Sequence, residues 1–146
     1  MALKVDQRFS HEHVQEYQDE DLIFSEGDPG RDLYLVQDGG VVIRKKTPLG
    51  EIELARFAKG DFFGDMALLQ GLPRYASAYA RGATRLLILQ PGGFLLKIRR
   101  DPTLAFEMLQ QLSYRVRVSN ERLMETISKA GFSKDAVQDI LNSIGG

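Results

Sequence analysis

Residues 63–77 read FGDMALLQGLPRYAS and hold the densest chemical signal in the chain. Within this stretch, Gly64 lets the backbone turn tightly, and residues 65–70 are numerous enough to form one short helix. The first turn of a helix leaves N–H groups without intrahelical partners, which makes it attractive to anions. Arg74 follows shortly afterwards and carries a planar guanidinium whose geometry suits a phosphate. The spacing of these features predicts a loop that holds a phosphate group.

Asp65 stands among these donors, where its negative charge cannot favour a phosphate. We expect its carboxylate instead to accept hydrogen bonds from hydroxyl groups, such as those of a ribose. The alternative for Asp65 is a carboxylate that is merely stabilised by the dipole at a helix N-terminus. The alternative for Arg74 is an ordinary surface arginine in a loop.

From about Val14 to Leu89, the chain around this stretch reads as short β-strands separated by glycine-containing turns. The strand-like runs are residues 21–25, 32–37, 41–45, 51–57, 76–80 and 84–89. The turn signals are residues 26–30, 38–40, 47–50 and 59–61. Many short strands at such spacing predict a sandwich, jelly roll or barrel rather than a parallel sheet, which would need helices between its strands.

A helical region follows Pro91, and residues 94–100 are expected to form one or two turns. Asp101 is predicted to cap a long helix whose first residue is Pro102. Neither glycine nor proline occurs between residues 103 and 128. Residues in this helix recur at alternating spacings of three and four, as in the a and d positions of a coiled coil. They are Leu109, Leu112, Val116, Ser119, Leu123 and Thr126.

Two interpretations of this stripe remain open. It could be ordinary core, with the helix lying on the β-domain, or it could meet its twin in a homodimer. An apolar helix face of this length is a liability when it stays exposed, which favours the dimer. Both interpretations can hold on different faces, because Leu104, Met108 and Val118 offer a second apolar set.

A short amphipathic helix is predicted at the C-terminal end. Gly131 ends the long helix, and Ser133 is expected to cap the next one, with Phe132 placed to contact Val137. Its apolar stripe consists of Val137, Ile140, Leu141 and Ile144. A helix this short needs something to dock on. No further helix follows that could serve as the recognition helix of a helix-turn-helix motif, so we expect no direct binding of nucleic acid.

The composition of the 146 residues fits a globular domain, with 43% hydrophobic and 27% charged residues. A formal net charge of −1 gives no long-range attraction to nucleic acid. The absence of cysteine excludes thiolate catalysis, cysteine-based zinc sites and disulfides. No apolar run approaches the roughly 18 residues of a membrane span, and the N-terminus lacks a signal peptide. We therefore predict a cytoplasmic protein without membrane contact.

No enzymatic motif is present, and we expect neither catalysis nor a cofactor or metal. The chain has no nucleophile elbow, Walker loop or dinucleotide fingerprint. His11 and His13 could suggest a metal pair, but no third ligand stands near them, so a solvated terminus is expected. A metal-dependent cupin enzyme needs histidine and carboxylate ligands on its strands, and no histidine occurs after residue 13.

Residues 63–77 resemble the phosphate-binding cassette of the cyclic nucleotide-binding domain family. This family includes the bacterial catabolite activator protein, the regulatory subunits of protein kinase A and cyclic-nucleotide-gated channels. The cassette reads approximately Phe-Gly-Glu-x-Ala-Leu-Leu, a short spacer, and then Pro-Arg-x-Ala-Ser/Thr. Residues 23–30, 33–36 and 38–41 also resemble the first strands and turns of the family, so the resemblance extends from about residue 14 to 128.

The resemblance implies a mainly β fold, a jelly-roll-like β-roll or double-stranded β-helix, followed by helices. The β-roll would comprise residues 1–100, a long dimerisation or lid helix residues 101–130, and a short helix residues 131–146. The implied ligand-binding residues are Phe63, Gly64, Asp65, Met66, Ala67, Arg74, Tyr75, Ala76, Ser119 and Asn120.

The same resemblance implies roles for these residues. Arg74 would pair with the phosphate of a cyclic nucleotide, and nearby backbone N–H groups would complete the oxyanion cradle. Asp65 would accept a hydrogen bond from the ribose 2′-OH. Ser119 or Asn120 would meet the base edge, partly from the helix of a partner subunit.

Two residues depart from the family pattern. Asp65 replaces a glutamate and is one methylene shorter, and Tyr75 replaces a small residue that often carries a hydroxyl. We expect a non-enzymatic sensor of a cyclic nucleotide, with cyclic AMP as the first candidate. Two alternatives remain: a protein-interaction module of the same fold that binds no ligand, and the regulatory part of a transcription regulator whose DNA-binding part is absent.

Overall fold

The computed structural model describes residues 2–3, 9 and 13–145 of the chain, without the side chains of residues 144 and 145. His11 and the side chain of Ile144 lie outside this part. By its internal contacts the chain divides into two compact units, Met1–Met108 and Leu109–Gly146.

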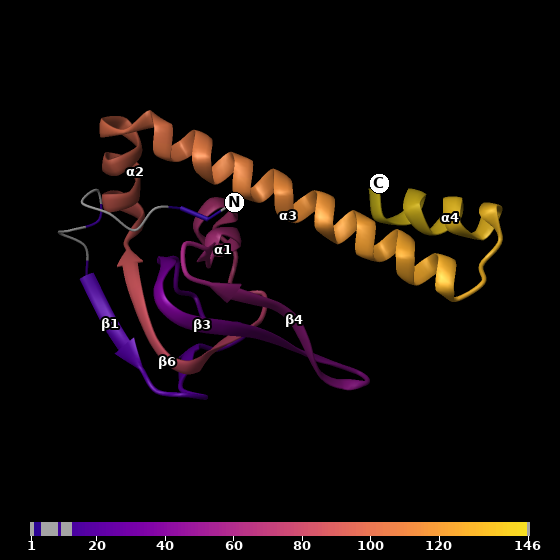
Figure 1. Ribbon diagram of the computed structural model, residues 1–146, viewed down its shortest axis with the longest axis horizontal. Helices are drawn as coiled ribbons and strands as arrows, with labels where there is room; N and C mark the ends of the chain where they lie inside the picture. The colour runs from indigo at the N-terminus through magenta and orange to yellow at the C-terminus, as the bar shows by residue number, and fades with distance from the viewer. Residues whose placement is uncertain (1, 4–8, 10–12, 146) are drawn as a thin grey trace. The chain divides into compact units, whose positions relative to one another are not determined.

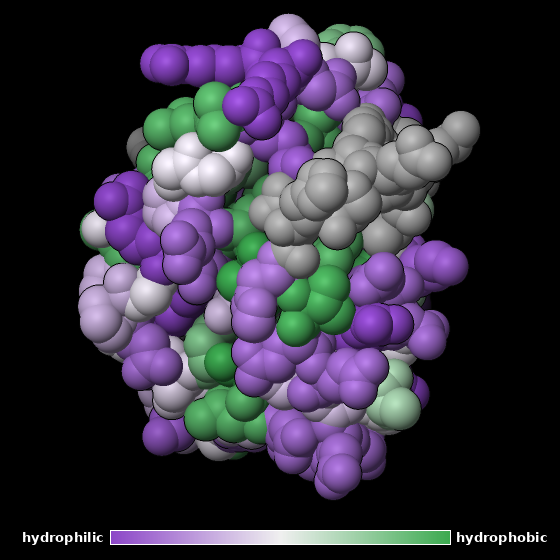
Figure 2. Space-filling view, turned by 90° about the vertical axis from the view of Figure 1, so that its left-hand side faces the viewer, coloured by the Kyte–Doolittle hydropathy of each residue, from purple (hydrophilic) through white to green (hydrophobic). Residues whose placement is uncertain are grey.

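The first unit is built on one antiparallel sheet of six strands (Figure 1). The strands are β1 (His13–Tyr17), β2 (Leu22–Phe24), β3 (Leu33–Thr47), β4 (Gly50–Ala58), β5 (Phe62–Phe63) and β6 (Ser77–Leu89). Their order is β1-β6-β3-β4, with β2 paired to β6 and β5 paired to β3. On the face seen from the side of β1, hydrophobic residues gather near the middle and hydrophilic residues surround them (Figure 2). The antiparallel sheet with helices after it confirms the predicted β-roll.

The long strands β3 and β6 differ from the sequence-based prediction, which divided each of them in two. The predicted turn at residues 38–40 is an irregularity within β3, where the pairing with β6 shifts register. Gly39 has a φ of +79°, and a Cβ there would collide with the Ala83 carbonyl oxygen. The chain therefore bends at a glycine without leaving the sheet. The strands β1 and β5 were not predicted as separate elements.

The core of the first unit consists largely of aromatic and branched side chains from β3, β5 and β6. Its buried cluster comprises Tyr34, Val36, Val41, Phe63, Ala78 and Leu86. The rings of Tyr34 and Phe63 stack with their centroids 5.0 Å apart, and those of Phe57 and Phe63 stack at 5.8 Å. Phe63 directly precedes Gly64 and so connects this aromatic layer to the predicted phosphate loop.

Three helices follow or interrupt the strands of the first unit. They are α1 (Asp65–Gln70), α2 (Pro91–Arg100) and the first turns of α3 (Pro102–Lys129). The helix α2 begins at Pro91, earlier than the predicted residue 94, because proline is well tolerated in the first turn of a helix. Leu104 and Met108 of α3 are buried at 1% and 7% exposure, whereas Val118, the third member of the second apolar set, is half-buried.

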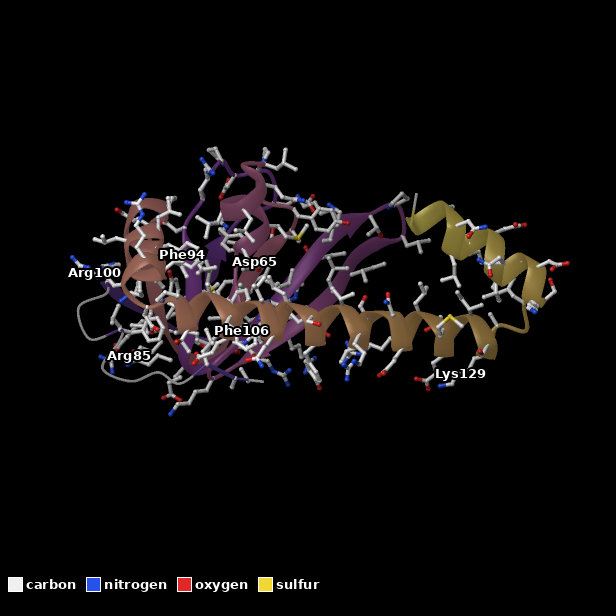
Figure 3. The ribbon with its side chains drawn as sticks, turned by 90° about the horizontal axis from the view of Figure 1, so that it is seen from above. Asp65, Arg85, Phe94, Arg100, Phe106 and Lys129 are labelled. Carbon is white, nitrogen blue, oxygen red and sulfur yellow. The ribbon has the colours of Figure 1, made fainter. Side chains whose placement is uncertain are left out.

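The second unit consists of the rest of α3 and of α4 (Lys134–Gly145), which runs back alongside the end of α3 (Figures 1 and 3). Gly131 adopts a φ of +75° between them. The Ala136 N–H donates to Ser133 Oγ at 3.2 Å, which confirms the predicted cap. Ile127 is buried. Leu109 and Val116 of the predicted seam are exposed at 62% and 61%, so this unit does not bury them.

Candidate functional site

A cavity of about 230 Å³ lies in the first unit beside the predicted phosphate loop. It is lined by Phe24, Ile43, Leu54, Ala55, Phe57, Phe63, Gly64, Asp65, Met66, Ala67, Arg74, Tyr75 and Ala76. Every ligand-binding residue predicted between positions 63 and 76 therefore lies at this one cavity. Ser119 and Asn120 are exposed residues of α3 in the second unit. The contact of any of these residues with a ligand remains a prediction.

A bulge in β4 contributes to the wall of the cavity. Ile43 pairs with Ala55, and the next residue of β3 pairs with Glu53, so that Leu54 is left over between the two pairs. A bulge re-aims side chains locally. This explains how the consecutive residues Leu54 and Ala55 both line the cavity.

Gly64 is the residue on which the geometry of the loop depends. It precedes α1 with φ +83°, a conformation that L side chains rarely adopt. A Cβ at this position would lie 2.9 Å from Arg74 Nη1 and 2.9 Å from the Asp32 carbonyl oxygen. Glycine therefore serves both the turn and the close approach of the Arg74 side chain.

Arg74 is buried, with 4% of its surface exposed, so it is not a surface arginine in a loop. Its Nη1 donates to the Gly64 carbonyl at 3.1 Å, and its Nη2 donates to the Asp32 carbonyl at 2.9 Å. The guanidinium lies 4.2 Å from the centroid of the Phe24 ring. Burial lowers the pKa of Arg74, whereas Tyr34 and nearby carboxylates act in the opposite direction.

One nitrogen of this guanidinium makes no hydrogen bond within the described part of the chain. Arg74 Nε is buried and has no hydrogen-bond partner among the described residues. Its two bonded nitrogens face neutral carbonyl oxygens, so the positive charge is solvated by dipoles and rings rather than by a direct anionic partner. A buried donor without a partner is costly, and Arg74 lines the adjoining cavity, where an anion would meet its positive charge.

The backbone of Arg74 is tied to the turn between β2 and β3. Its N–H donates to the Asp28 carbonyl at 2.8 Å, and its carbonyl accepts from the Gly27 N–H at 2.8 Å. Three residues along, Ser77 Oγ accepts from the Glu26 N–H at 2.8 Å. The sequence predicted this turn, but its role in holding the loop had no sequence signal.

Tyr75 is 55% exposed, so the loop accommodates this unusual residue at its surface. Lys45 Nζ lies 4.0 Å from the ring centroid and donates to the Tyr75 carbonyl at 2.8 Å. The same ammonium pairs with Glu26 Oε1 at 3.2 Å. Lys45 was not singled out from the sequence, where a lysine in a strand carries no distinguishing signal.

Asp65 is half-buried at the start of α1 and lines the cavity. Its negative charge is one of those that raise the pKa of Arg74. The carboxylate and the guanidinium therefore stand at the same cavity, as the sequence analysis expects for a ligand with both hydroxyl and anionic groups. The assignment of Asp65 to a ribose remains a prediction.

A larger cavity of about 610 Å³ is lined by Asp32 and Tyr34, among others, but not by Arg74. Tyr34 stacks on Phe63 of the smaller cavity, and Asp32 holds Arg74 through its carbonyl. The smaller cavity is the candidate site because its lining includes the guanidinium itself.

Two further features of the described part of the chain bear on function. Its histidine and acidic side chains form no group of three or more that could hold a metal ion. None of its helices combines the length and the apolar character needed to cross a membrane.

An antiparallel β-roll with a buried arginine beside a largely apolar cavity defines the class of small-ligand-binding β-roll domains. The family model described as cyclic nucleotide-binding domain matches residues 14–101, and the chain belongs to this family.

Named relatives agree with this membership. The chain is 41% identical over 103 residues to the cyclic AMP receptor protein of Thermus thermophilus, covering 69% of this chain and 47% of that protein. It is 38% identical over 81 residues to a cAMP-dependent protein kinase regulatory subunit of Hypocrea atroviridis, covering 56% of this chain and 17% of that protein. The chain thus spans less than half the length of these relatives.

Solved structures show the same similarity. The crystal structure of the Thermus thermophilus catabolite activator protein matches with a TM-score of 0.72 and 31% identity, over 88% of this chain and 68% of that one. The regulatory domain of Toxoplasma gondii PKA, crystallised with cAMP, matches with a TM-score of 0.56 and 26% identity, over 67% of this chain and 38% of that one.

Proposed function

We propose that the chain is a non-enzymatic sensor module that binds a cyclic nucleotide, with cyclic AMP as the first candidate, in the cavity beside Arg74. The names of its relatives, a cyclic AMP receptor protein and a cAMP-dependent protein kinase regulatory subunit, support this ligand class. The proposal includes no cofactor or metal. The cytoplasmic location predicted from the sequence belongs to the same proposal.

The observation that carries the proposal is the buried guanidinium of Arg74 with its unpartnered Nε. A cyclic nucleotide phosphate is a monoanionic diester whose two exocyclic oxygens accept hydrogen bonds. It would satisfy Nε and balance the buried charge. The apolar lining residues Ile43, Leu54 and Phe57 offer a surface for the remainder of such a ligand.

The backbone near Arg74 offers further donors. The N–H groups of Tyr75 and Ala76 make no hydrogen bond within the described part of the chain. Both residues line the cavity, and Ala76 is 5% exposed. In the proposed complex these two groups share the phosphate oxygens with Arg74.

The proposed output is a shift in the population of conformations of α3. A ligand moves such an equilibrium only by its difference in affinity for the conformations. Ser119 and Asn120 on α3 are the predicted contacts of the base. Dimerisation through residues 103–128 is part of this proposal, and the exposure of Leu109 and Val116 supports it.

Isothermal titration calorimetry tests the proposal. Cyclic AMP, cyclic GMP and a cyclic dinucleotide are titrated into the wild-type protein, into Arg74→Ala and into the control Arg85→Ala. Arg85 is an exposed arginine of β6 that lies apart from Asp65 in Figure 3. We expect micromolar or tighter binding to the wild type and to Arg85→Ala.

For Arg74→Ala we expect a loss of about 2–4 kcal/mol, or roughly 30- to 1000-fold in affinity. Circular dichroism verifies that each variant is folded. Folded wild-type protein that binds none of the three ligands would overturn the proposal and favour the interaction module that binds no ligand.

A further inference from the structure

We infer that Lys45 is a positioning residue of the ligand site, an inference that rests on the proposed function. Its ammonium fixes the peptide group between Tyr75 and Ala76, and thereby directs a phosphate-binding N–H. Lys45 makes three contacts at this point: with the Tyr75 carbonyl at 2.8 Å, with the Tyr75 ring at 4.0 Å and with Glu26 at 3.2 Å.

The planarity of the peptide bond links the Tyr75 carbonyl to the Ala76 N–H. The carbonyl of one residue and the N–H of the next belong to one rigid trans unit and point in opposite directions, and the described chain contains no cis peptide. The Tyr75 carbonyl points at Lys45 Nζ. The Ala76 N–H therefore points away from Lys45.

The preceding peptide is anchored in the same way by a different group. The Arg74 carbonyl accepts from the Gly27 N–H, which fixes the direction of the Tyr75 N–H. Two successive N–H groups are thus oriented through the carbonyls of their own peptide planes. The backbone of the turn holds the first, and the side chain of Lys45 holds the second.

Residues 75 and 76 need such anchors because they belong to no strand or helix. The strand β6 begins only at Ser77. The ladder hydrogen bonds that fix a peptide plane inside a sheet are therefore absent at this point. A side chain that reaches the Tyr75 carbonyl takes their place.

The strand β3 delivers Lys45 to this position. Alternate residues of a strand share a face, and Ile43, two residues earlier, lines the cavity. Arg44 points to the other face, where it pairs with Glu20 and lies 4.8 Å from the centroid of the Tyr79 ring. Arg44 and Lys45 each have an acidic partner and an aromatic ring nearby, but only Lys45 contacts the loop. Arg44 is therefore a suitable control.

Lys45 and Glu26 form a partly buried ion pair beside the loop. The ammonium of Lys45 is partly desolvated, at 27% side-chain exposure, and Glu26 balances it at an equal exposure. Because Glu26 offsets this charge, the contribution of Lys45 to the site rests on the position of its ammonium rather than on a net positive charge.

The test compares Lys45→Met, which keeps the length of the side chain, with Lys45→Arg and with the control Arg44→Met. The first measurement is ¹⁵N relaxation of the Tyr75 and Ala76 amides in the full chain without ligand. We expect the order parameter of Ala76 to fall below about 0.6, the flexible range, in Lys45→Met only. The second measurement is the affinity for cyclic AMP, which we expect to fall about tenfold in Lys45→Met and to recover in Lys45→Arg.

The outcomes separate the inference from the proposed function. Unchanged order at Ala76 in Lys45→Met would overturn the positioning role, even if affinity fell, since charge alone would then suffice. If the order parameter of Ala76 fell in Lys45→Met while its affinity for cyclic AMP stayed the same, the role of Lys45 in ligand binding would be overturned. If the wild-type protein bound no cyclic nucleotide while Lys45→Met lost order at Ala76, the proposed function would fail and the anchoring of the peptide would stand.

Discussion

The Gly64 carbonyl accepts a hydrogen bond from Arg74 Nη1 at 3.1 Å, and a Cβ on Gly64 would lie 2.9 Å from that same nitrogen. The two residues are thus matched: the glycine leaves the space that the arginine occupies and supplies one of its acceptors. A change at either position is expected to affect the other.

The variant Gly64→Ala tests this match, with Gly82→Ala as its control. Both glycines have a positive φ, +83° and +73°, but a Cβ at Gly82 would meet nothing within 4 Å. The left-handed conformation costs an alanine about 1–2 kcal/mol at either position. We expect Gly64→Ala to lower the free energy of unfolding further, because the Arg74 side chain must move. Urea unfolding of both variants measures the difference, and equal losses would contradict the match.

Arg74→Lys separates the charge of this residue from its two-pronged geometry. The variant retains the charge but leaves at least one of the Gly64 and Asp32 carbonyls without its present donor. We expect the free energy of unfolding to fall by about 1–3 kcal/mol, the cost of an unsatisfied buried polar group. The exposed control Arg85→Lys should change it little, and an equal loss in both variants would contradict the structural role of Arg74.

Tyr34 makes stability depend on alkaline pH. Burial raises the pKa of its phenol above the ordinary value of about 10, and the positive charge of Arg74 opposes this rise. The neutral phenol therefore favours the folded state. This contribution is fully present below about pH 10 and is lost as the pH rises toward the pKa of the folded protein.

Urea unfolding between about pH 9 and 11 measures this dependence. We expect the free energy of unfolding to fall more steeply in the wild type than in Tyr34→Phe. The free energy of unfolding of Tyr34→Phe still falls somewhat with pH, because burial also raises the pKa of Tyr17. Identical slopes in the two proteins would contradict the prediction.

Asp65→Glu restores the longer carboxylate of the family pattern. If the side chain of Asp65 reaches the ribose hydroxyl only poorly, one added methylene should tighten cyclic AMP binding, by about fivefold for a hydrogen bond of roughly 1 kcal/mol. Asp65→Asn should weaken it, because the amide is the poorer acceptor. Calorimetry measures both affinities, and a weaker complex with Asp65→Glu would contradict the ribose contact.

The exposed face of α3 gives a prediction for oligomeric state. Val116 and Tyr114 lie on nearly opposite sides of the helix at about 100° per residue, with exposures of 61% and 50%. We expect Val116→Glu to convert a dimer into a monomer in sedimentation velocity and Tyr114→Glu to leave it unchanged. A monomeric wild-type protein would contradict dimerisation through this helix.

The β-roll and the cassette could be predicted because their signals are local in sequence. Gly64 and Arg74 stand ten residues apart within one recognisable run. The burial of Arg74 could not be predicted in the same way, because Asp32 and Phe24, on which it depends, lie more than forty residues away. The anchor at Lys45 escaped prediction for the same reason, since its partners Glu26 and Tyr75 come from two segments distant from it in the sequence.

The prediction that β3 and β6 are each divided into two strands was wrong for a different reason. A glycine cluster at residues 38–40 signals a turn, yet pairing with β6 on both sides keeps the segment within the sheet. Tertiary contacts thus override a local turn preference, and Thr84 Oγ1 supports the irregularity by donating to the Gly40 carbonyl at 2.9 Å.

Arg74 is the one charged side chain that is buried among the described residues, and it brings a single positive charge to the cavity. Asp65 brings a negative charge to the same cavity. A phosphodiester adds one further negative charge, whereas a phosphate monoester adds between one and two at neutral pH. The excess charge would leave water for a largely apolar enclosure at a cost of several kcal/mol. Hydrolytic opening of the ring therefore turns the proposed ligand into a molecule that this cavity disfavours.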